Sequence, residues 1–352
     1  MASFKPVFEK KRTIPGVEWP LAAIVLIAFQ ASAQTPAAVT PPRPDASLAP
    51  VTISERASAV VADVTGFPDI PLARSPFSAT VVDSATIEKI GAQRLTDLFR
   101  LDSSLSNAYN AVGYWDFVTI RGFVVDQTYN FRRDGLPISG ETFIPLENKE
   151  RVEFLKGTSG ILAGTSSPGG LVNYVVKRPT EATLRGLRLE TSSEGGLLAH
   201  LELGGRFGDD RGFGYRLNAV AADVHSYVPD ANGQRGLFAL AMDWRATRDT
   251  LVEAEFELSR LKQPSVPGLS LLGNALPPAN PFININSQPW SQPNEFDSFT
   301  GSIGIQQAIN SQWRWQGQLG TQQLKTDDRL AYPFGCYDTS SGTYYADRFC
   351  PN

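Results

Sequence analysis

The sequence is poor in the residue types on which catalytic and metal sites depend. Its 352 residues include two cysteines, two histidines and two methionines. The histidines, His200 and His225, fall in expected strands or at strand ends, and no Ser/His/Asp or paired-carboxylate arrangement accompanies them. Two sulfurs alone make a poor zinc site. We therefore expect no enzymatic activity and no resident metal or cofactor.

Charge is also scarce, and basic charge is not in excess. Charged residues make up 19% of the chain and the net charge is −4. A nucleic-acid surface requires a basic patch, so we exclude nucleic acid as a partner. Glycine (30) and proline (25) are plentiful, and the length allows two domains of ordinary size.

The N-terminus has only a short apolar run, Leu21–Phe29, which follows four basic residues between positions 5 and 12. A membrane-spanning helix needs about 20 apolar residues, so this run is too short to cross. Ala31-Ser32-Ala33 matches an A-x-A cleavage site. The layout predicts a secretory signal peptide over residues 1–33 and export of the protein.

Residues 34–71 are rich in Ala, Pro, Thr and Val and show no sustained periodicity. Such a composition predicts an extended linker.

Further along the chain lie two β-type runs, Val152–Leu155 and Leu171–Val176, around a segment dense in Gly, Ser and Thr. The glycines allow tight turns and close backbone approach, and Pro179 ends the unit because proline cannot donate to a sheet ladder.

A phosphate-cradling loop is one alternative reading of these glycines. The Walker motif requires Gly-Lys-Ser/Thr at the start of a helix. Lys156-Gly157-Thr158 has the wrong order and follows a strand, so the pattern disfavours a nucleotide site.

The literal sequence of this segment resembles the plug domain of the TonB-dependent outer-membrane receptors, most closely the ferric-siderophore branch. The resemblance covers residues 72–179 and has four ordered elements, Ile-Arg-Gly-Phe, Asp-Gly-x-Pro, the Glu-Phe-Leu-Lys-Gly run and Pro-Gly-Gly-x-Val-Asn. Thr158 and Ala163 stand where many members have Pro and Tyr. The motif positions are Arg121, Gly122, Phe123, Asp134, Gly135, Glu153, Lys156, Gly157, Pro168, Gly169, Gly170, Asn173, Lys177 and Pro179.

Within residues 72–179 we expect a short strand at Ser78–Val82 and a helix over Ser84–Phe99, capped by Asp83 or Ser84. Gly91 weakens that helix, because glycine costs about 1 kcal/mol relative to alanine there. The resemblance implies that apical loops face outward and bind ligand. Aromatic faces suit iron chelates and arginine suits an anionic complex. The ligand-facing candidates are Tyr109, Tyr114, Trp115 and Arg121.

A plainer interpretation stays open for these residues. Tyr109 and Trp115 could be ordinary packing aromatics, and Arg121 could be a structural ion-pair partner.

The resemblance also implies a TonB box in the linker, a short segment that adds a strand to TonB. Val51-Thr52-Ile53-Ser54-Glu55 is the better candidate, ahead of Val60-Val61-Ala62, and a featureless linker is the alternative for both.

After Pro179 the pattern changes to long alternating strands. In Leu251–Leu258 the even positions are apolar, whereas Glu253, Glu255 and Glu257 form an acidic ladder on the other face. Seven strands are expected, at 182–192, 197–207, 212–224, 235–246, 249–261, 296–309 and 311–324.

Alternation also occurs in soluble β-sandwiches. Short turns alternating with long loops favour instead a transmembrane barrel with an apolar outer face. Trp244, Trp313 and Trp315 at strand ends fit an interfacial aromatic girdle. The fold class is therefore an α+β plug domain inside an antiparallel transmembrane β-barrel. Residues 180–352 would supply about seven of the twenty-two strands that the resemblance implies, as expected of a fragment.

The two cysteines, Cys336 and Cys350, lie in the last expected loop. In an exported protein a disulfide between them is favoured over two free thiols.

The acidic ladder leads to a separate prediction. Because the plug is rich in Arg and Lys, part of the ladder should pair with plug cations, through wet contacts worth about 0–1 kcal/mol each.

The resemblance implies a transporter of the bacterial outer membrane that imports a ferric siderophore. Its partners would be TonB with the inner-membrane energising complex, the ferric siderophore and outer-membrane lipid. Iron would arrive already chelated, so no cofactor is implied. The alternatives are another cargo (cobalamin, haem or a glycan) and a passive outer-membrane channel.

Overall fold

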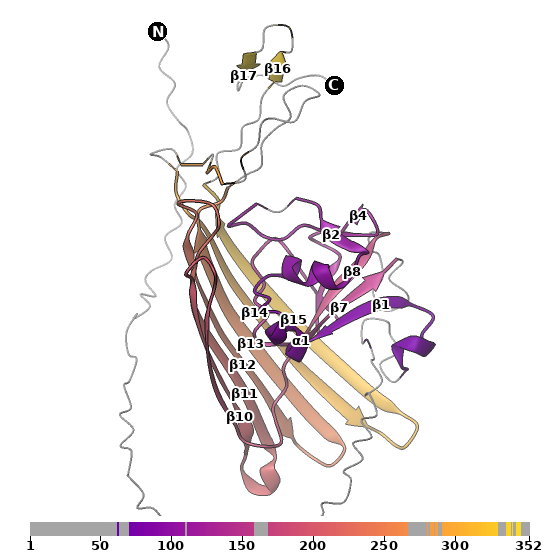
Figure 1. The fold of residues 1–352 in the computed structure, drawn as a ribbon. Coiled ribbons are helices and arrows are strands. Elements are labelled where there is room, and N and C mark those ends of the chain that lie inside the picture. The colour runs from indigo at the N-terminus through magenta and orange to yellow at the C-terminus, as the bar shows by residue number, and fades with distance from the viewer. Residues whose placement is uncertain are drawn as a thin grey trace, which may run out of the picture. The chain divides into compact units, whose positions relative to one another are not determined.

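A computed structural model describes residues 62, 70–109, 111–157, 168–266, 280, 282–284, 286–287, 291–329, 336–338, 340 and 343–345. Its main elements are a small α+β region, here called the plug, and a sheet of seven long strands, here called the wall (Figure 1). Thr158, Ala163, the signal peptide and both TonB-box candidates except Ala62 lie outside the described residues.

The plug contains two sheets. The five-stranded sheet has the order β1-β7-β8-β5-β6, in which β5 pairs with β8 in parallel and the other neighbours are antiparallel. The smaller sheet has the order β2-β3-β4. The strands are β1 (Ser78–Asp83), β2 (Leu105–Asn107), β3 (Val118–Ile120), β4 (Phe123–Val124), β5 (Phe131–Arg133), β6 (Leu136–Ile138), β7 (Lys149–Lys156) and β8 (Gly170–Val176).

The expected helix over Ser84–Phe99 is wrong in its length. Helix α1 covers only Ser84–Lys89, and a 3₁₀ helix, η3 (Leu95–Leu101), follows after a break. Asp83 caps α1 as predicted, accepting a hydrogen bond of 2.8 Å from the Thr86 N–H. Gly91 has φ +63°, a left-handed conformation that ends an α-helix. A further 3₁₀ turn, η2 (Leu72–Arg74), precedes β1.

The plug core lies between its five-stranded sheet and its helical turns. Val152 and Phe154 of β7 pack there with Leu98, as their alternation in the sequence predicts. Leu155 points to the opposite face and packs with Leu171 and Ala62. The sheet is therefore buried on both faces over its central strands.

The wall is a continuous antiparallel sheet with its strands in chain order (Figure 1). The strands are β9 (Leu184–Thr191), β10 (Leu197–Phe207), β11 (Phe213–Val224), β12 (Gly233–Arg245), β13 (Thr250–Gln263), β14 (Asn294–Ala308) and β15 (Arg314–Asp327). All seven predicted strands are present, with ends within three residues of those expected. A 3₁₀ turn, η4 (Asp209–Arg211), joins β10 to β11, and a small hairpin pairs β16 (Cys336–Asp338) with β17 (Thr343–Tyr345).

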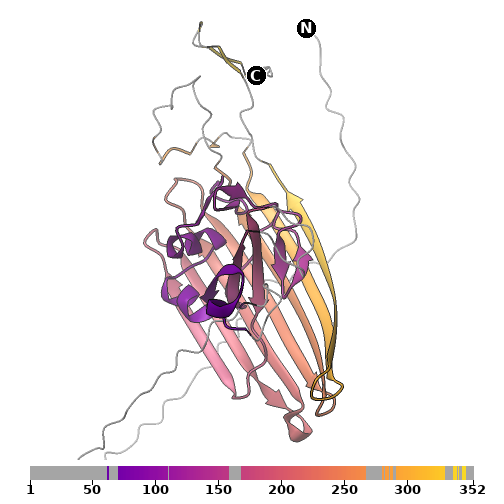
Figure 2. The same cartoon turned by 90° about the vertical axis from the view of Figure 1, so that its right-hand side faces the viewer.

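The two faces of the wall differ in polarity. One face exposes large apolar side chains, among them Leu187, Trp244, Trp315 and Leu319, the last of which is 75% exposed. The other face carries polar residues such as Asn218, Glu255, Glu257 and Thr300, and the plug lies on it (Figure 2). A sheet face that exposes this many large apolar side chains is typical of a membrane-facing sheet. None of the helices among the described residues is long and apolar enough to cross a membrane.

Gly170 offers a test of the close backbone packing in the plug. Its φ is +128°, and an added Cβ would clash with the Leu155 carbonyl. We expect Gly170→Ala to lower the free energy of unfolding by more than about 1 kcal/mol, because both the conformation and the space oppose a side chain. Thermal unfolding of the full-length protein in detergent measures this.

The matched control is Gly186→Ala in the wall, where an added Cβ meets its nearest atom at 3.8 Å. Equal unfolding temperatures for the two variants would contradict the packing described at Gly170.

Candidate functional site

The motif residues of the plug assemble into one hydrogen-bonded unit. Asp134 and Gly135 form the turn between β5 and β6, with φ +47° and +81°. Asn173 on β8 accepts a hydrogen bond of 3.0 Å from the Gly135 N–H and donates one of 2.9 Å to Glu153 on β7. Asp134 accepts a hydrogen bond of 3.0 Å from the Val176 N–H. These residues therefore hold the β5–β6 turn against the central strands.

The plug meets the wall through a buried ionic cluster, here called the docking cluster, of Arg133, Lys149, Glu255 and Glu257. Arg133 donates two hydrogen bonds to Glu255, of 3.0 and 2.6 Å, and a third to Glu257 at 2.7 Å. Lys149 Nζ lies 2.7 Å from the same Glu257 oxygen. The exposed fractions of all four side chains are between 0% and 4%. Two cations and two carboxylates sum to zero charge, which is the condition for burying ions in contact.

Two further cations extend these contacts along the wall. Lys177 Nζ lies 3.0 Å from Glu202 of β10, and Arg178 Nε lies 3.5 Å from Glu253 of β13. In a further pair the acid belongs to the plug and the base to the wall: Glu147 lies 2.5 Å from Arg235 of β12. The prediction that the acidic ladder pairs with plug cations is therefore confirmed for all three glutamates.

The expected wetness of these contacts is wrong. The pairs of Glu255 and Glu257 are buried, because Arg133 and Lys149 fill the space between the plug sheet and the wall. A desolvated ion that loses its partner costs about 3–5 kcal/mol, far more than an exposed pair contributes. Sequence alternation identified the glutamates, but Lys149 and its neighbour Asn148 were not identified. The only indication of Asn148 and Lys149 in the sequence was that polar residues stand at the start of an otherwise apolar strand.

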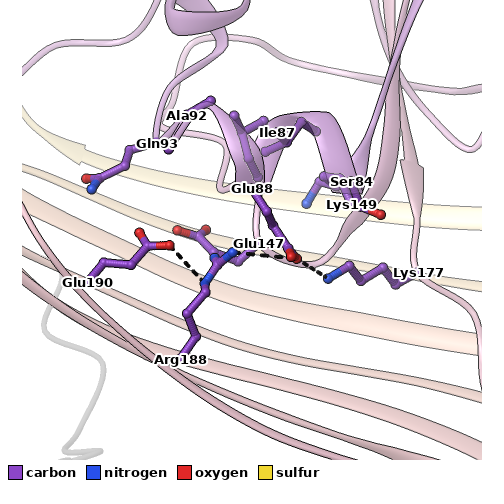
Figure 3. Close-up of a pocket in the computed structure, with 12 residues that line it drawn as sticks. Ser84, Ile87, Glu88, Ala92, Gln93, Glu147, Lys149, Lys177, Arg188 and Glu190 are labelled. Carbon is purple, nitrogen blue, oxygen red and sulfur yellow. Dashed lines mark ion pairs between the residues drawn. The ribbon is translucent and has the colours of Figure 1, made fainter.

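Contact between α1 and the wall is looser. A pocket lies there, into which Glu88 of α1 points toward Lys177 and Arg188 (Figure 3). Both distances are 3.5 Å, and Glu88 is 44% exposed. Lys177 belongs to the plug and Arg188 to the wall, so α1 itself meets the wall through one long, partly solvated pair, in contrast to the docking cluster.

Two of the predicted ligand-facing aromatics lie in contact with each other. The rings of Tyr114 and Trp115 are 4.0 Å apart, and each lies 5.6 Å from Phe296 of β14. Trp115 is also 6.2 Å from Phe117, which in turn is 6.2 Å from Tyr109. The residues 109 and 111–117, here called the aromatic loop, thus carry one continuous group of rings.

The aromatic loop is tied to the bases of two long connections of the wall. The Val266 N–H donates a hydrogen bond of 3.0 Å to the Val112 carbonyl, just after β13. The Tyr114 hydroxyl donates one of 2.8 Å to Asp328, just after β15. Burial, and the nearby Asp328 carboxylate, raise the pKa of Tyr114, so its hydroxyl stays protonated as a donor.

Arg94, which sequence reasoning missed, holds the loop from the plug side. Its guanidinium donates hydrogen bonds of 2.7 Å to the Tyr114 carbonyl and 2.5 Å to the Asp116 carboxylate. Burial raises the pKa of Asp116, and Arg94 opposes this shift. No sequence pattern relates these residues, because they lie about twenty positions apart in irregular segments.

Arg121 lies apart from this group in the described contacts. It is exposed, has φ +53°, and donates a hydrogen bond of 3.1 Å to Ser78 at the start of β1. The roles of Tyr109, Tyr114, Trp115 and Arg121 in ligand binding stay predictions. The side chain of Cys336 and all of Cys350 lie outside what the structure describes, so the disulfide also stays a prediction.

Comparison with known proteins defines the class. Residues 71–171 match the family model of the TonB-dependent receptor plug domain. The chain therefore contains a plug domain of the TonB-dependent receptor type over these residues, and its wall corresponds to part of the barrel in that fold.

Individual relatives agree with this assignment. The chain is 27% identical over 183 residues to the ferrichrome outer membrane transporter/phage receptor of Escherichia coli K12, covering 50% of this chain and 24% of that protein. It is 23% identical over 270 residues to the ferrichrome receptor FcuA of Yersinia enterocolitica, covering 73% and 35%. The chain thus spans about a quarter to a third of the length of these relatives.

A solved structure shows the same fold. The ferric preacinetobactin receptor BauA of Acinetobacter baumannii superposes with a TM-score of 0.65 at 23% identity, covering 71% of this chain and 38% of that one. The relatives named here are described as receptors or transporters rather than enzymes, and the Escherichia coli protein as a transporter of the outer membrane.

The docking cluster predicts the behaviour of a charge-removing variant. Glu257→Gln keeps the size of the side chain but leaves Arg133 and Lys149 facing a neutral group. We expect it to weaken docking by about 3–5 kcal/mol and to raise the ligand-independent conductance of the full-length protein in planar bilayers.

Glu295→Gln on the outward face is the control, because it removes a carboxylate from exposed ion pairs worth about 0–1 kcal/mol. A conductance of Glu257→Gln equal to that of the wild type would show that the docking cluster does not hold the plug.

Proposed function

We propose that this protein is a TonB-dependent transporter that imports a ferric siderophore across the bacterial outer membrane. The observation that carries the proposal is a plug seated by a buried ionic cluster on the polar face of a wall whose other face is apolar. A plug closes a pore until work is done on it, so this arrangement favours energised transport over passive diffusion.

The named relatives support iron chelates as the cargo. Two are described as ferrichrome receptors or transporters and a third as a ferric preacinetobactin receptor. The continuous rings of the aromatic loop offer faces for such a chelate. Iron enters as part of the cargo, so the proposal includes no resident cofactor and no enzymatic step.

Energy coupling follows from where the plug is strongly and weakly held. TonB would bind an extended segment near Val51–Glu55 and pull on the chain ahead of β1. This strand is at the edge of the plug sheet, and α1 beside it forms one long, partly solvated pair with the wall, between Glu88 and Arg188. The docking cluster holds β5, β7 and the wall together, so a moderate pull displaces the weakly held side first.

Export and location complete the proposal. The predicted signal peptide over residues 1–33 would send the chain across the inner membrane, and the apolar face of the wall would contact outer-membrane lipid. Tyr109, Tyr114 and Trp115 would contact the ligand from the plug. Arg121 is a weaker candidate, because its described hydrogen bond is to β1.

Growth on defined iron sources tests the cargo and the energy source together. We expect a deletion strain complemented with the full-length gene to grow on at least one ferric siderophore as sole iron source. Ferrichrome, ferrioxamine B and ferripyoverdine are the first probes. The same strain without TonB should not grow, because the plug then stays seated.

Growth that persists without TonB would indicate a passive channel. Rescue by haem alone among the iron sources, or uptake of cobalamin or a glycan without siderophore-dependent growth, would assign a different cargo.

Tyr109 provides a test of the ligand surface, because it is the most exposed of the three aromatics. We expect Tyr109→Leu to bind the growth-supporting ferric siderophore about fivefold more weakly than wild type, through loss of the aromatic face. Fluorescence quenching in detergent measures the Kd. Tyr109→Phe, which keeps the ring, should bind like wild type; equal affinity of all three proteins would remove Tyr109 from the site.

A further inference from the structure

The rings of the aromatic loop stand on irregular backbone. Residues 111–117 form no helix and no strand beyond an isolated bridge between Val112 and Val266. No sheet ladder therefore sets the direction in which Tyr114 and Trp115 point. Both side chains are partly exposed, so their arrangement depends on individual contacts along the loop.

The wall fixes the start of this loop. Gly113 has φ +73° and packs so closely on Pro264 that an added Cβ would overlap the Pro264 carbonyl. Together with the hydrogen bond between Val266 and Val112, this contact fixes the backbone at residues 112 and 113. The wall meets the next residue through its side chain, at the Tyr114 hydroxyl.

The plug fixes the backbone on both sides of Trp115 with a single guanidinium. Arg94 Nη2 donates hydrogen bonds to the Tyr114 carbonyl, at 2.7 Å, and to the Asp116 carboxylate, at 2.5 Å. These two acceptors directly precede and follow Trp115 in the chain. Gln127 adds a hydrogen bond of 2.9 Å to the Asp116 carbonyl. The position of Arg94 thus sets the direction of the backbone that carries the Trp115 ring.

Arg94 itself starts from a rigid base. It directly precedes η3, and the Asp97 carboxylate accepts hydrogen bonds from its N–H, at 3.0 Å, and from the Gln93 N–H, at 2.8 Å. Leu98 of η3 is fully buried in the plug core. The side chain of Arg94 is 28% exposed and that of Asp116 is 13% exposed, so solvent reaches their ion pair only in part. The pair therefore fixes the loop more firmly than an exposed pair of the same charges.

The environment of Asp116 makes its charge depend on Arg94. Burial and the nearby Asp97 carboxylate raise the pKa of Asp116, and Arg94 opposes both. Without the guanidinium the charged carboxylate is unstable at this place, and its route to water is a movement of residues 114–116. Such a movement would carry the Trp115 ring with it.

We propose that Arg94 is a positioning residue for cargo binding, which holds Tyr114 and Trp115 in one arrangement before the cargo arrives. The proposal rests on the ligand-binding role given to the aromatic loop under Proposed function. Rings that are already ordered lose less conformational entropy when a ligand binds, so this order raises affinity. Arg94 acts through the loop rather than on the cargo, because both of its acceptors belong to the loop.

Two measurements on the full-length protein in detergent test this role. The first needs no cargo and is the emission of Trp115, obtained by subtracting the spectrum of the same protein with Trp115→Phe. We expect Arg94→Gln to shift this emission to longer wavelength, because the indole turns toward water. The second is the Kd for ferrichrome, ferrioxamine B and ferripyoverdine. For each of these that the wild type binds, we expect Arg94→Gln to weaken binding at least about tenfold.

Two further variants separate positioning from general damage to the fold. Arg94→Gln/Asp116→Asn leaves no unpaired carboxylate, so it should restore the emission and bring the Kd within about threefold of wild type. The control is Arg100→Gln, because Arg100 also lies in η3 but is exposed and donates its hydrogen bond to the Ile90 carbonyl. It should match wild type in both measurements. Thermal unfolding checks that each variant is folded at the temperature used.

Unchanged emission in Arg94→Gln would overturn the proposal, since the loop would then be held without the guanidinium. An unchanged Kd despite shifted emission would also overturn it, because the loop would move without altering the cargo site. Equally weak binding by the double variant would show that Arg94 acts on the cargo directly. If the wild type binds none of the three siderophores, the proposed cargo fails, whereas the emission still decides whether Arg94 positions the loop.

Discussion

The structure depends on four buried charges, Arg133, Lys149, Glu255 and Glu257, which neutralise one another between the plug and the wall. Removing one of them would leave an ion without a partner in a dry space, which is costly. The cluster therefore acts as a specific anchor: it fixes which strand of the plug faces which strand of the wall. The buried pair of Glu147 with Arg235 and the pair of Lys177 with Glu202 add to this anchor, whereas the contact of α1 with the wall is long and partly solvated.

The anchor is possible because each strand of the wall separates polar from apolar residues with a period of two. The same alternation that turns Glu255 and Glu257 toward the plug turns Phe256 and Leu258 outward. A slip of one residue in register would place the glutamates in lipid and the phenylalanine against Arg133. Docking of the plug and insertion of the wall are thus two consequences of one pattern, which explains why the strands are long and free of bulges.

Much of this fold was predictable from the sequence, for reasons that differ by region. Alternation is a local signal, so all seven strands of the wall and the faces of Glu253, Phe299 and Trp315 were predicted correctly. The plug motifs were recognised from literal sequence, because Gly170 and Asn173 have roles that other residues cannot fill. The helix over Ser84–Phe99 was predicted too long. Gly91 adopts a left-handed conformation that ends the helix, and helix propensity alone does not predict this conformation.

Contacts between distant irregular segments were not predictable. Arg94 and Asp116 meet only because the chain folds back, and Lys149 gave no periodic signal that it would be buried. The depth of the ionic contacts was also misjudged, because exposure depends on how neighbouring elements close over a side chain. The alternation in a sequence indicates which residues share a face of a strand, whereas tertiary packing determines which of them are buried.

The arrangement of a plug on one face and lipid on the other is tested most directly by single spin labels along β13 from Thr250 to Leu261 in full-length protein in bilayers. Labels at even positions from Val252 to Leu258 should be accessible to oxygen dissolved in lipid. Labels at the odd positions Ser259 and Leu261, which are buried on the plug side, should be shielded from both oxygen and a water-soluble relaxing agent, whereas Glu255 and Glu257 stay unlabelled so that the docking cluster is kept. Oxygen accessibility without a period of two, or an apolar face that contacts the water-soluble agent, would contradict the structure described here.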